Sequence, residues 1–212
     1  MPVWQSVYED IDDDNFVLIS AAQDTGGEKA TGKIFDAAKV TYTAIIDEDH
    51  TISTLFNLVN VPSGIWIDED GQIVRINEGT YAAKHKLGTF EFGTDAYVPA
   101  VRDWISKGAD SAFVWSPEEV ARNIIQRTPD AQRAEPAFKL GVYFHRQGNE
   151  DLANRWWEES QKLNPDSWNF HRQDWSFTPR EATRNWYRKV QTLGDKPYYR
   201  PLGLPGEDTD TQ

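Results

Sequence analysis

Apolar residues near the start of the chain recur at helical spacing. Within the first eleven positions they fall three or four residues apart, at Val3, Trp4, Val7, Tyr8 and Ile11. This spacing gathers them on one face of a helix. The acidic run DDD at 12–14 and the following Asn15 mark the end of this predicted helix.

Shorter apolar runs then predict strands that alternate with helices. The run FVLISAA at 16–22 is continuous, as is typical of a parallel strand buried on both faces. We expect a helix over about 28–38, a second strand in TYTAII at 41–46, and a short helix in TISTLFNLVN at 51–60.

The segment SGIWIDEDGQIVRI at 63–76 has the pattern of a hairpin. Two apolar strands, 63–67 and 72–76, flank Asp70-Gly71, a dipeptide that favours a two-residue turn. A closing helix is predicted over 95–108. The order of strand, helix, strand, helix, hairpin and helix is typical of an α/β layer fold.

After residue 108 the pattern is helical. Ser116, Pro117 and Glu119 supply the N-cap, the first-turn proline and the capping box of a helix over 116–127.

Residues 134–167 match a tetratricopeptide repeat, a helical hairpin with a period of about 34 residues. The positions that carry the match are Leu140, Gly141, Phe144, Gly148, Ala153, Trp157 and Pro165. Because a single repeat cannot bury its own faces, we expect the helices at 116–127 and 180–193 to cap it.

Charge divides the chain near residue 108. Residues 1–108 carry 18 acidic and 8 basic side chains, whereas residues 109–212 are nearly neutral and hold six of the nine tryptophans. We therefore predict an α/β domain at 1–108, an all-α helical domain at 109–205 and a disordered polar tail at 206–212. The crowded aromatic residues are interpreted as core, with an aromatic groove for a peptide or partner helix as the alternative.

The overall charge limits the partners. A net charge of −12 repels phosphate backbones and anionic lipid, so we expect no nucleic-acid and no membrane partner. No apolar run approaches the ~20 residues of a membrane span, and the start MPVWQSVYEDIDDDNF lacks the regions of a signal peptide. As written, the chain is expected to stay in the cytoplasm, with export of a longer form left open.

Candidate chemistry is scarce. The absence of cysteine from all 212 residues excludes disulfides, thiolate metal sites and thiol catalysis by these residues. The acidic runs 47–49 and 68–70 are explained by helix-start and turn chemistry. Four histidines lack paired metal-ligand spacing and are interpreted as isolated surface residues: His50, His85, His145 and His171. We expect no metal, no cofactor and no catalytic residue within the chain.

Several segments of the first half resemble the thioredoxin-like redoxins of the TlpA/ResA type. The matching pieces are MPVWQSVYED at 1–10, LISAAQD at 18–24, the long run from Tyr42 to Val74, and the helix at 95–107. The resemblance implies an α/β thioredoxin-like fold, incomplete at its N-terminus, followed by an all-α TPR-like helical region.

The same resemblance assigns a role to Val61 and Pro62. In thioredoxin-like proteins the proline before the hairpin is cis, and the backbone beside it pairs with an extended substrate segment. The resemblance therefore implies that Val61 and Pro62 bind a protein or peptide substrate. The TPR-like aromatic region is the other expected binding surface.

The resemblance also places the family's first core strand and its Cys-x-x-Cys motif upstream of residue 1. Two interpretations follow: a truncated redoxin oxidoreductase whose cysteine or selenocysteine lies upstream, or a non-catalytic thioredoxin-like and TPR protein-binding module. We favour truncation, because loss of a central strand forfeits ~2 kcal/mol per buried apolar side chain and leaves two unpaired edges. The strands at 16–22 and 63–67 should then not pair directly with each other.

Overall fold

The strands of the first half form three separate two-stranded sheets. The computed structural model describes residues 2–87 and 90–204. Strand β1 (Ile19–Ala22) pairs in parallel with β2 (Thr43–Ile46), while antiparallel hairpins join β3 (Ser63–Ile67) to β4 (Ile73–Glu78) and β5 (His85–Leu87) to β6 (Phe90–Phe92). Within these described ranges no backbone ladder joins one sheet to another, so β1 and β3 are not paired.

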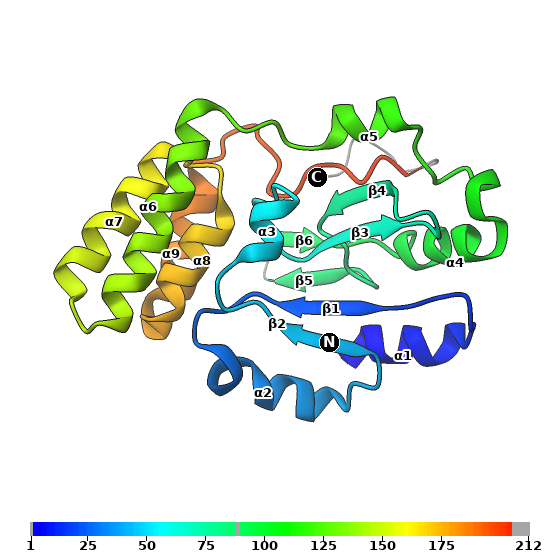
Figure 1. The fold of residues 1–212 in the computed structure, drawn as a ribbon, viewed down its shortest axis with the longest axis horizontal. Helices are drawn as coiled ribbons and strands as arrows, with labels where there is room; N and C mark the ends of the chain where they lie inside the picture. The colour runs from blue at the N-terminus through cyan, green and yellow to red at the C-terminus, as the bar shows by residue number, and fades with distance from the viewer. Residues whose placement is uncertain (1, 88–89, 205–212) are drawn as a thin grey trace.

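The helices of the first half follow the predicted periodicity. α1 (Pro2–Ile11), α2 (Gly27–Ala38) and α4 (Tyr97–Lys107) agree with the prediction, and α1 and α2 lie beside the β1–β2 pair (Figure 1). The helix expected over 51–60 is shorter, because α3 (Thr51–Leu55) ends before Asn57, whose φ of 54° is left-handed. The alternation of helices and strands confirms a mixed α/β structure.

Strand β1 differs from its prediction. The run 16–22 was expected to be a strand buried on both faces, yet β1 begins only at Ile19 and none of its four residues is buried. Ile19 is 60% exposed, and Val17 just before it is 71% exposed. The prediction was wrong because neither face is covered fully: Ile19 and Ala21 on one face are exposed, and Ser20 and Ala22 on the other are half-buried.

The hairpin turn is longer than the expected two-residue turn. The backbone N–H of Gly71 donates to the Asp68 carbonyl, and that of Asp68 donates to the Gln72 carbonyl, both at 3.0 Å. Gly71 takes a φ of 77°, which its lack of a Cβ allows. The Asp68 carboxylate accepts the N–H of Asp70 and of Gln72, so its predicted turn role is confirmed. The β5–β6 hairpin was not predicted, since its strands have three residues each.

The core of the first half lies between α4 and the β3–β4 hairpin. At its centre Trp66 stacks on Trp104, with ring centroids 4.9 Å apart, and donates from Nε1 to the Tyr97 hydroxyl at 2.9 Å. Leu202 and Leu204, each 4% exposed, complete this cluster from the far end of the sequence.

Residues 198–204, named here the C-terminal segment, run along β4 (Figure 1). The buried side chain of Arg75 donates to the carbonyls of Leu202 at 2.6 Å and Gly203 at 3.0 Å. Asn77 donates to the Leu202 carbonyl at 3.0 Å. A segment from the predicted second domain therefore packs against the predicted first domain. The domain boundary near residue 108 stays a prediction. The expected disordered tail at 206–212 lies outside the described residues.

The second half is helical, as predicted. It contains α5 (Pro117–Asn123), α6 (Pro129–Arg146), α7 (Glu150–Leu163), α8 (Trp168–Ser176) and α9 (Pro179–Gln191). The predicted capping box at the start of α5 is present: Ser116 Oγ accepts the Glu119 N–H, and the Glu119 carboxylate accepts the Ser116 N–H.

Helices α6 and α7 form the hairpin expected over 134–167. The turn between them contains Gly148, whose φ is 71°. The predicted close approach is present, since Gly141 faces the indole of Trp157 with no room for a Cβ. Ala153, with no exposed surface, lies in the same contact.

The helices that cover this hairpin differ from the prediction. α8 packs against α7, and α9 packs against α8, whereas α5 packs on β4. The expectation that 116–127 caps the repeat was therefore wrong: α5 ends at Asn123, and Phe170 of α8 supplies the aromatic side chain that closes the helical core. In the part of the chain that the structure describes, no helix combines the length and apolarity needed to cross a bilayer.

Replacing Gly141 with Ala tests the close approach of α6 and α7. The new Cβ would overlap the Trp157 indole, so we expect a loss of about 1–3 kcal/mol in the free energy of unfolding, measured by urea denaturation. The matched control is Gly32→Ala in α2, where a Cβ would meet only the flexible Glu28 side chain at 3.4 Å. There we expect a gain of about 0.5–1 kcal/mol. Equal effects of the two changes would contradict the packing described here.

Candidate functional site

The Val61–Pro62 peptide bond at the entry to β3 is cis, as the resemblance implied. The Pro62 carbonyl accepts the Gly79 N–H at 2.8 Å, which ties the start of β3 to the end of β4. On the other side, Asn60 is fully buried, and its Oδ1 accepts the Val61 N–H at 3.0 Å. Ser63 Oγ donates to the Asn60 carbonyl at 2.7 Å. The local backbone is therefore held on both sides of the proline.

The C-terminal segment covers this site. The Tyr199 hydroxyl donates to the Val61 carbonyl at 3.0 Å and lies 2.9 Å from the Tyr81 hydroxyl. Burial raises the pKa of Tyr199, so its hydroxyl keeps the proton that it donates. Asn60 Nδ2 also donates to the Tyr198 carbonyl at 3.1 Å. Both backbone groups of Val61 thus have partners in the chain itself, and an extended peptide that paired there would displace Tyr199.

Helices α8 and α9 hold the C-terminal segment in place. Arg172 of α8 donates to the Tyr198 hydroxyl and, at 3.4 Å, to the Tyr199 hydroxyl. Trp186 of α9 donates from Nε1 to the Tyr198 hydroxyl at 3.0 Å, and Trp168 packs edge-on against the Tyr198 ring with centroids 4.5 Å apart. The aromatic residues of the helical half therefore position the tyrosine that reaches Val61.

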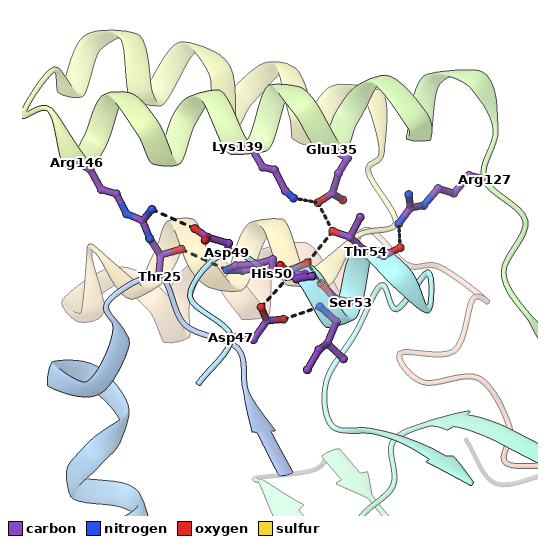
Figure 2. Close-up of polar contacts among 12 residues, drawn as sticks. Thr25, Asp47, Asp49, His50, Ser53, Thr54, Arg127, Glu135, Lys139 and Arg146 are labelled. Carbon is purple, nitrogen blue, oxygen red and sulfur yellow. Dashed lines mark hydrogen bonds and ion pairs between the residues drawn. The ribbon is translucent and has the colours of Figure 1, made fainter. Parts of the chain in front are cut away.

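A second polar cluster joins the two halves around His50 (Figure 2). His50, only 1% exposed, precedes α3 in a left-handed conformation with φ of 55°. Its Nε2 lies 2.9 Å from Gln173 Oε1 of α8 and 3.3 Å from Thr25 Oγ1. Because Gln173 Oε1 can only accept, Nε2 carries the proton, and the ring is held against Phe138 with centroids 4.9 Å apart. The interpretation of His50 as a surface residue was wrong.

Charged residues surround the polar cluster around His50. The Asp47 carboxylate accepts the N–H groups of Thr51 and Ile52, each at 2.8 Å, which confirms the helix-start interpretation of this acid. Arg146 of α6 pairs with Asp49 at 3.1 Å (Figure 2).

Thr54 of α3 binds the helical half through two groups. Its hydroxyl donates to Glu135 of α6, and its carbonyl accepts from Arg127 (Figure 2). Together with His50, these contacts fix α3 against α6 and α8.

Burial lowers the pKa of His50, because the interior disfavours the imidazolium. Gln173, Asp47, Glu135 and Asp24 act in the opposite direction without cancelling this effect. The ring is therefore neutral in the folded protein, and its Nδ1 has no hydrogen-bond partner among the described residues. A buried neutral ring suits a structural contact between the two halves better than a proton shuttle, which would need access to solvent.

Among the described residues, no group of three histidine or acidic side chains is placed to hold a metal ion. His85 contacts aromatic rings of the β5–β6 region, and His145 lies 3.0 Å from Glu150. The pKa of His171 is lowered to about 4 by burial and by Lys189. His85, His145 and His171 are half-buried, so their interpretation as surface residues is not confirmed.

The sequence pointed to Val61 and Pro62 but not to the residues that cover them. Tyr199 lies well over a hundred positions from Val61 in the sequence, in a segment with no helix or strand pattern. The only local signal was the aromatic pair Tyr198-Tyr199 next to prolines.

Comparison with known proteins gives no relative: no family model matches the chain, and neither curated proteins nor solved structures include a match.

Tyr199→Phe tests the contact with Val61. The variant leaves the Val61 carbonyl without its donor, so we expect a loss of about 1–3 kcal/mol in the free energy of unfolding. Tyr143→Phe, at an exposed tyrosine of α6, is the control and should change stability by less than about 0.5 kcal/mol. Both are measured by urea denaturation, and an unchanged midpoint for Tyr199→Phe would argue against the contact.

His50→Asn tests the neutral histidine. Because the folded pKa lies below the unfolded value of 6.5, the unfolded chain binds the extra proton. Stability is therefore lost as pH falls below about 6.5, by at most ~1.4 kcal/mol per pH unit from this residue. Asparagine tolerates the left-handed backbone and does not titrate. We expect urea denaturation to show a weaker acid dependence in this variant than in the wild type. His85→Asn, outside the polar cluster around His50, is the control for the substitution.

Proposed function

We propose that this chain is a thioredoxin-like redoxin scaffold joined to a TPR-like helical region. Support comes from the parallel β1–β2 pair, the β3–β4 hairpin that follows it, and the cis bond before Pro62. Since none of the 212 residues is cysteine, the thiol or selenol for disulfide exchange has to come from a further segment.

The observation that carries the proposal is the open apolar edge of β1. Apolar side chains in and beside the β1–β2 pair are also exposed: Val17 before β1 by 71%, Ile19 of β1 by 60% and Ile45 of β2 by 41%, although such strand-forming side chains favour burial. A strand edge without a partner is a template for another strand. A strand that paired along the free edge of β1 would satisfy the backbone groups that are unpaired among the described residues.

By the resemblance, that position belongs to the strand that ends in the Cys-x-x-Cys motif. A motif that arrived there would lie near Pro62, in the arrangement with which thioredoxin-like proteins exchange disulfides. In this proposal Val61 and Pro62 contact the extended substrate, and Tyr199 has to leave the Val61 carbonyl first.

A second candidate is a non-catalytic protein-binding module. It is favoured by apolar side chains that the helical half leaves exposed: Tyr143 is 56%, Tyr187 43% and Leu140 37% exposed. Such a module would still bind its partner after treatment with a thiol-blocking reagent. A redoxin would lose its disulfide-exchange activity after the same treatment.

The coding sequence upstream of the Met1 codon gives the direct test. An open frame that encodes a strand followed by Cys-x-x-Cys, or by its selenocysteine variant, is the expected result. A stop codon immediately upstream, with no such motif encoded, would contradict the redoxin proposal and favour the binding module.

A synthetic peptide supplies the biochemical test. We expect a strand-forming peptide that ends in Cys-x-x-Cys to bind residues 1–212 and to reduce a disulfide substrate faster than the peptide alone. Ile19→Lys places a charge on the open edge and should weaken binding by about tenfold or more, because the cation would be buried. Ile34→Lys, at an exposed isoleucine of α2, is the matched control and should bind as the wild type does. Equal binding by both variants would place the peptide elsewhere.

A further inference from the structure

A cavity of about 550 Å³ lies between the two halves of the molecule. It is lined by the chain that leads from α3 to β3, the end of β4, the α5–α6 connection, the start of α8 and part of the C-terminal segment. A smaller cavity of about 340 Å³ shares five of its lining residues, which are Asn57, Leu58, Glu78, Ile125 and Arg200. Volumes of this order are those of small-molecule sites.

Two buried acceptors in this lining lack a donor. Glu78, at the end of β4, is 9% exposed, and Asn169 of α8 is 3% exposed. Among the described residues, neither Glu78 Oε1 nor Asn169 Oδ1 has a hydrogen-bond partner. A buried polar atom without a partner is costly, and natural proteins contain few of them.

The two acceptors are held by the same stretch of backbone. Asn169 donates from its backbone N–H to the Val59 carbonyl at 3.0 Å and from Nδ2 to the Leu58 carbonyl at 2.8 Å. This fixes the Asn169 amide with Oδ1 on its remaining side. Glu78 accepts the backbone N–H of the same Val59. Both side chains therefore lie beside the backbone of Val59, and both residues line the same cavity.

The other charged groups of the lining already have partners. Arg127 donates to the Thr54 carbonyl, Arg200 to the Asn123 carbonyl at 3.1 Å, and Lys196 lies 3.5 Å from Asp166. Burial raises the pKa of Glu78, although Arg200 and the Val59 N–H act against this. What Glu78 Oε1 and Asn169 Oδ1 lack is a donor, and a positively charged one would keep the Glu78 carboxylate ionised.

We propose that this cavity binds a small organic ammonium ion whose N–H groups reach Glu78 Oε1 and Asn169 Oδ1. A primary ammonium brings three donors and the charge that a buried carboxylate requires. The apolar and aromatic lining around it, which includes Leu58, Ile125 and Trp168, suits a hydrocarbon or aromatic body. This site goes beyond the proposed redox function and does not depend on it.

Other ligand classes fit less well. A divalent metal ion needs several oxygen ligands, and the described residues contain no cluster of three acids or histidines. An anion would meet the Glu78 carboxylate, and the net charge of −12 repels it at long range. The same charge attracts a cation.

The probe is 2-phenylethylamine, a cation at neutral pH, and 2-phenylethanol is its neutral counterpart. Calorimetric titration of residues 1–212 should show binding of the amine and at least about tenfold weaker binding of the alcohol. Glu78→Gln keeps the shape but removes the charge, and should weaken amine binding by about 10- to 100-fold. Glu69→Gln makes the same change in net charge at an exposed turn and should bind like the wild type.

Two further measurements keep the test decisive. Thermal unfolding must show that Glu78→Gln folds, and we expect it to be at least as stable as the wild type, because it buries no carboxylate. In ¹⁵N spectra the indole N–H of Trp168, in the lining, should shift with the amine, while that of Trp4 in α1 should not. The proposal is overturned if the amine shows no binding at millimolar concentration, if amine and alcohol bind alike, or if Glu78→Gln binds as the wild type does.

Discussion

The arrangement of the chain depends on the hydrogen bonds that the buried guanidinium of Arg75 donates to backbone carbonyls. Only 1% exposed, it lies over the ring of Trp115 at 4.3 Å and donates to the carbonyls of Phe113, Leu202 and Gly203. A buried charge is tolerated only where hydrogen bonds replace its hydration. Here the replacement comes from two segments far apart in the sequence, so β4 orders both the chain after α4 and the C-terminal segment.

This anchor explains why the C-terminal segment reaches the cis-proline. Once the carbonyls of Leu202 and Gly203 are held on β4, Tyr199 lies three residues away and delivers its hydroxyl to Val61. The segment has no regular structure of its own, yet its polar groups are satisfied by side chains from both halves. Access to Val61 is therefore coupled to the packing of α8 and α9, which hold Tyr198 beside it.

Local signals in the sequence were sufficient for features that few residues determine. The capping box of Ser116 and Glu119, the close approach at Gly141 and the helices α1, α2 and α4 follow from side-chain size and periodicity. The candidate site was only half predictable. Pro62 was marked by its surroundings, whereas Tyr199 reaches Val61 through a contact between residues 138 positions apart. The exposure of β1 was missed for the same reason, because an apolar run does not show whether a distant part of the chain covers the faces of the strand.

Arg75 and Glu78 differ in whether the polar atoms of their buried side chains have hydrogen-bond partners. Both are buried charged residues of β4, three positions apart. The guanidinium of Arg75 donates to surrounding carbonyls, whereas one oxygen of Glu78 and one of Asn169 have no partner among the described residues, and both residues line a cavity. Natural sequences break packing rules mainly where function requires it. Exposed apolar side chains at β1 and unpartnered acceptors at Glu78 and Asn169 depart from these rules in different ways, which is why we propose different occupants for the two sites, a strand and a cation.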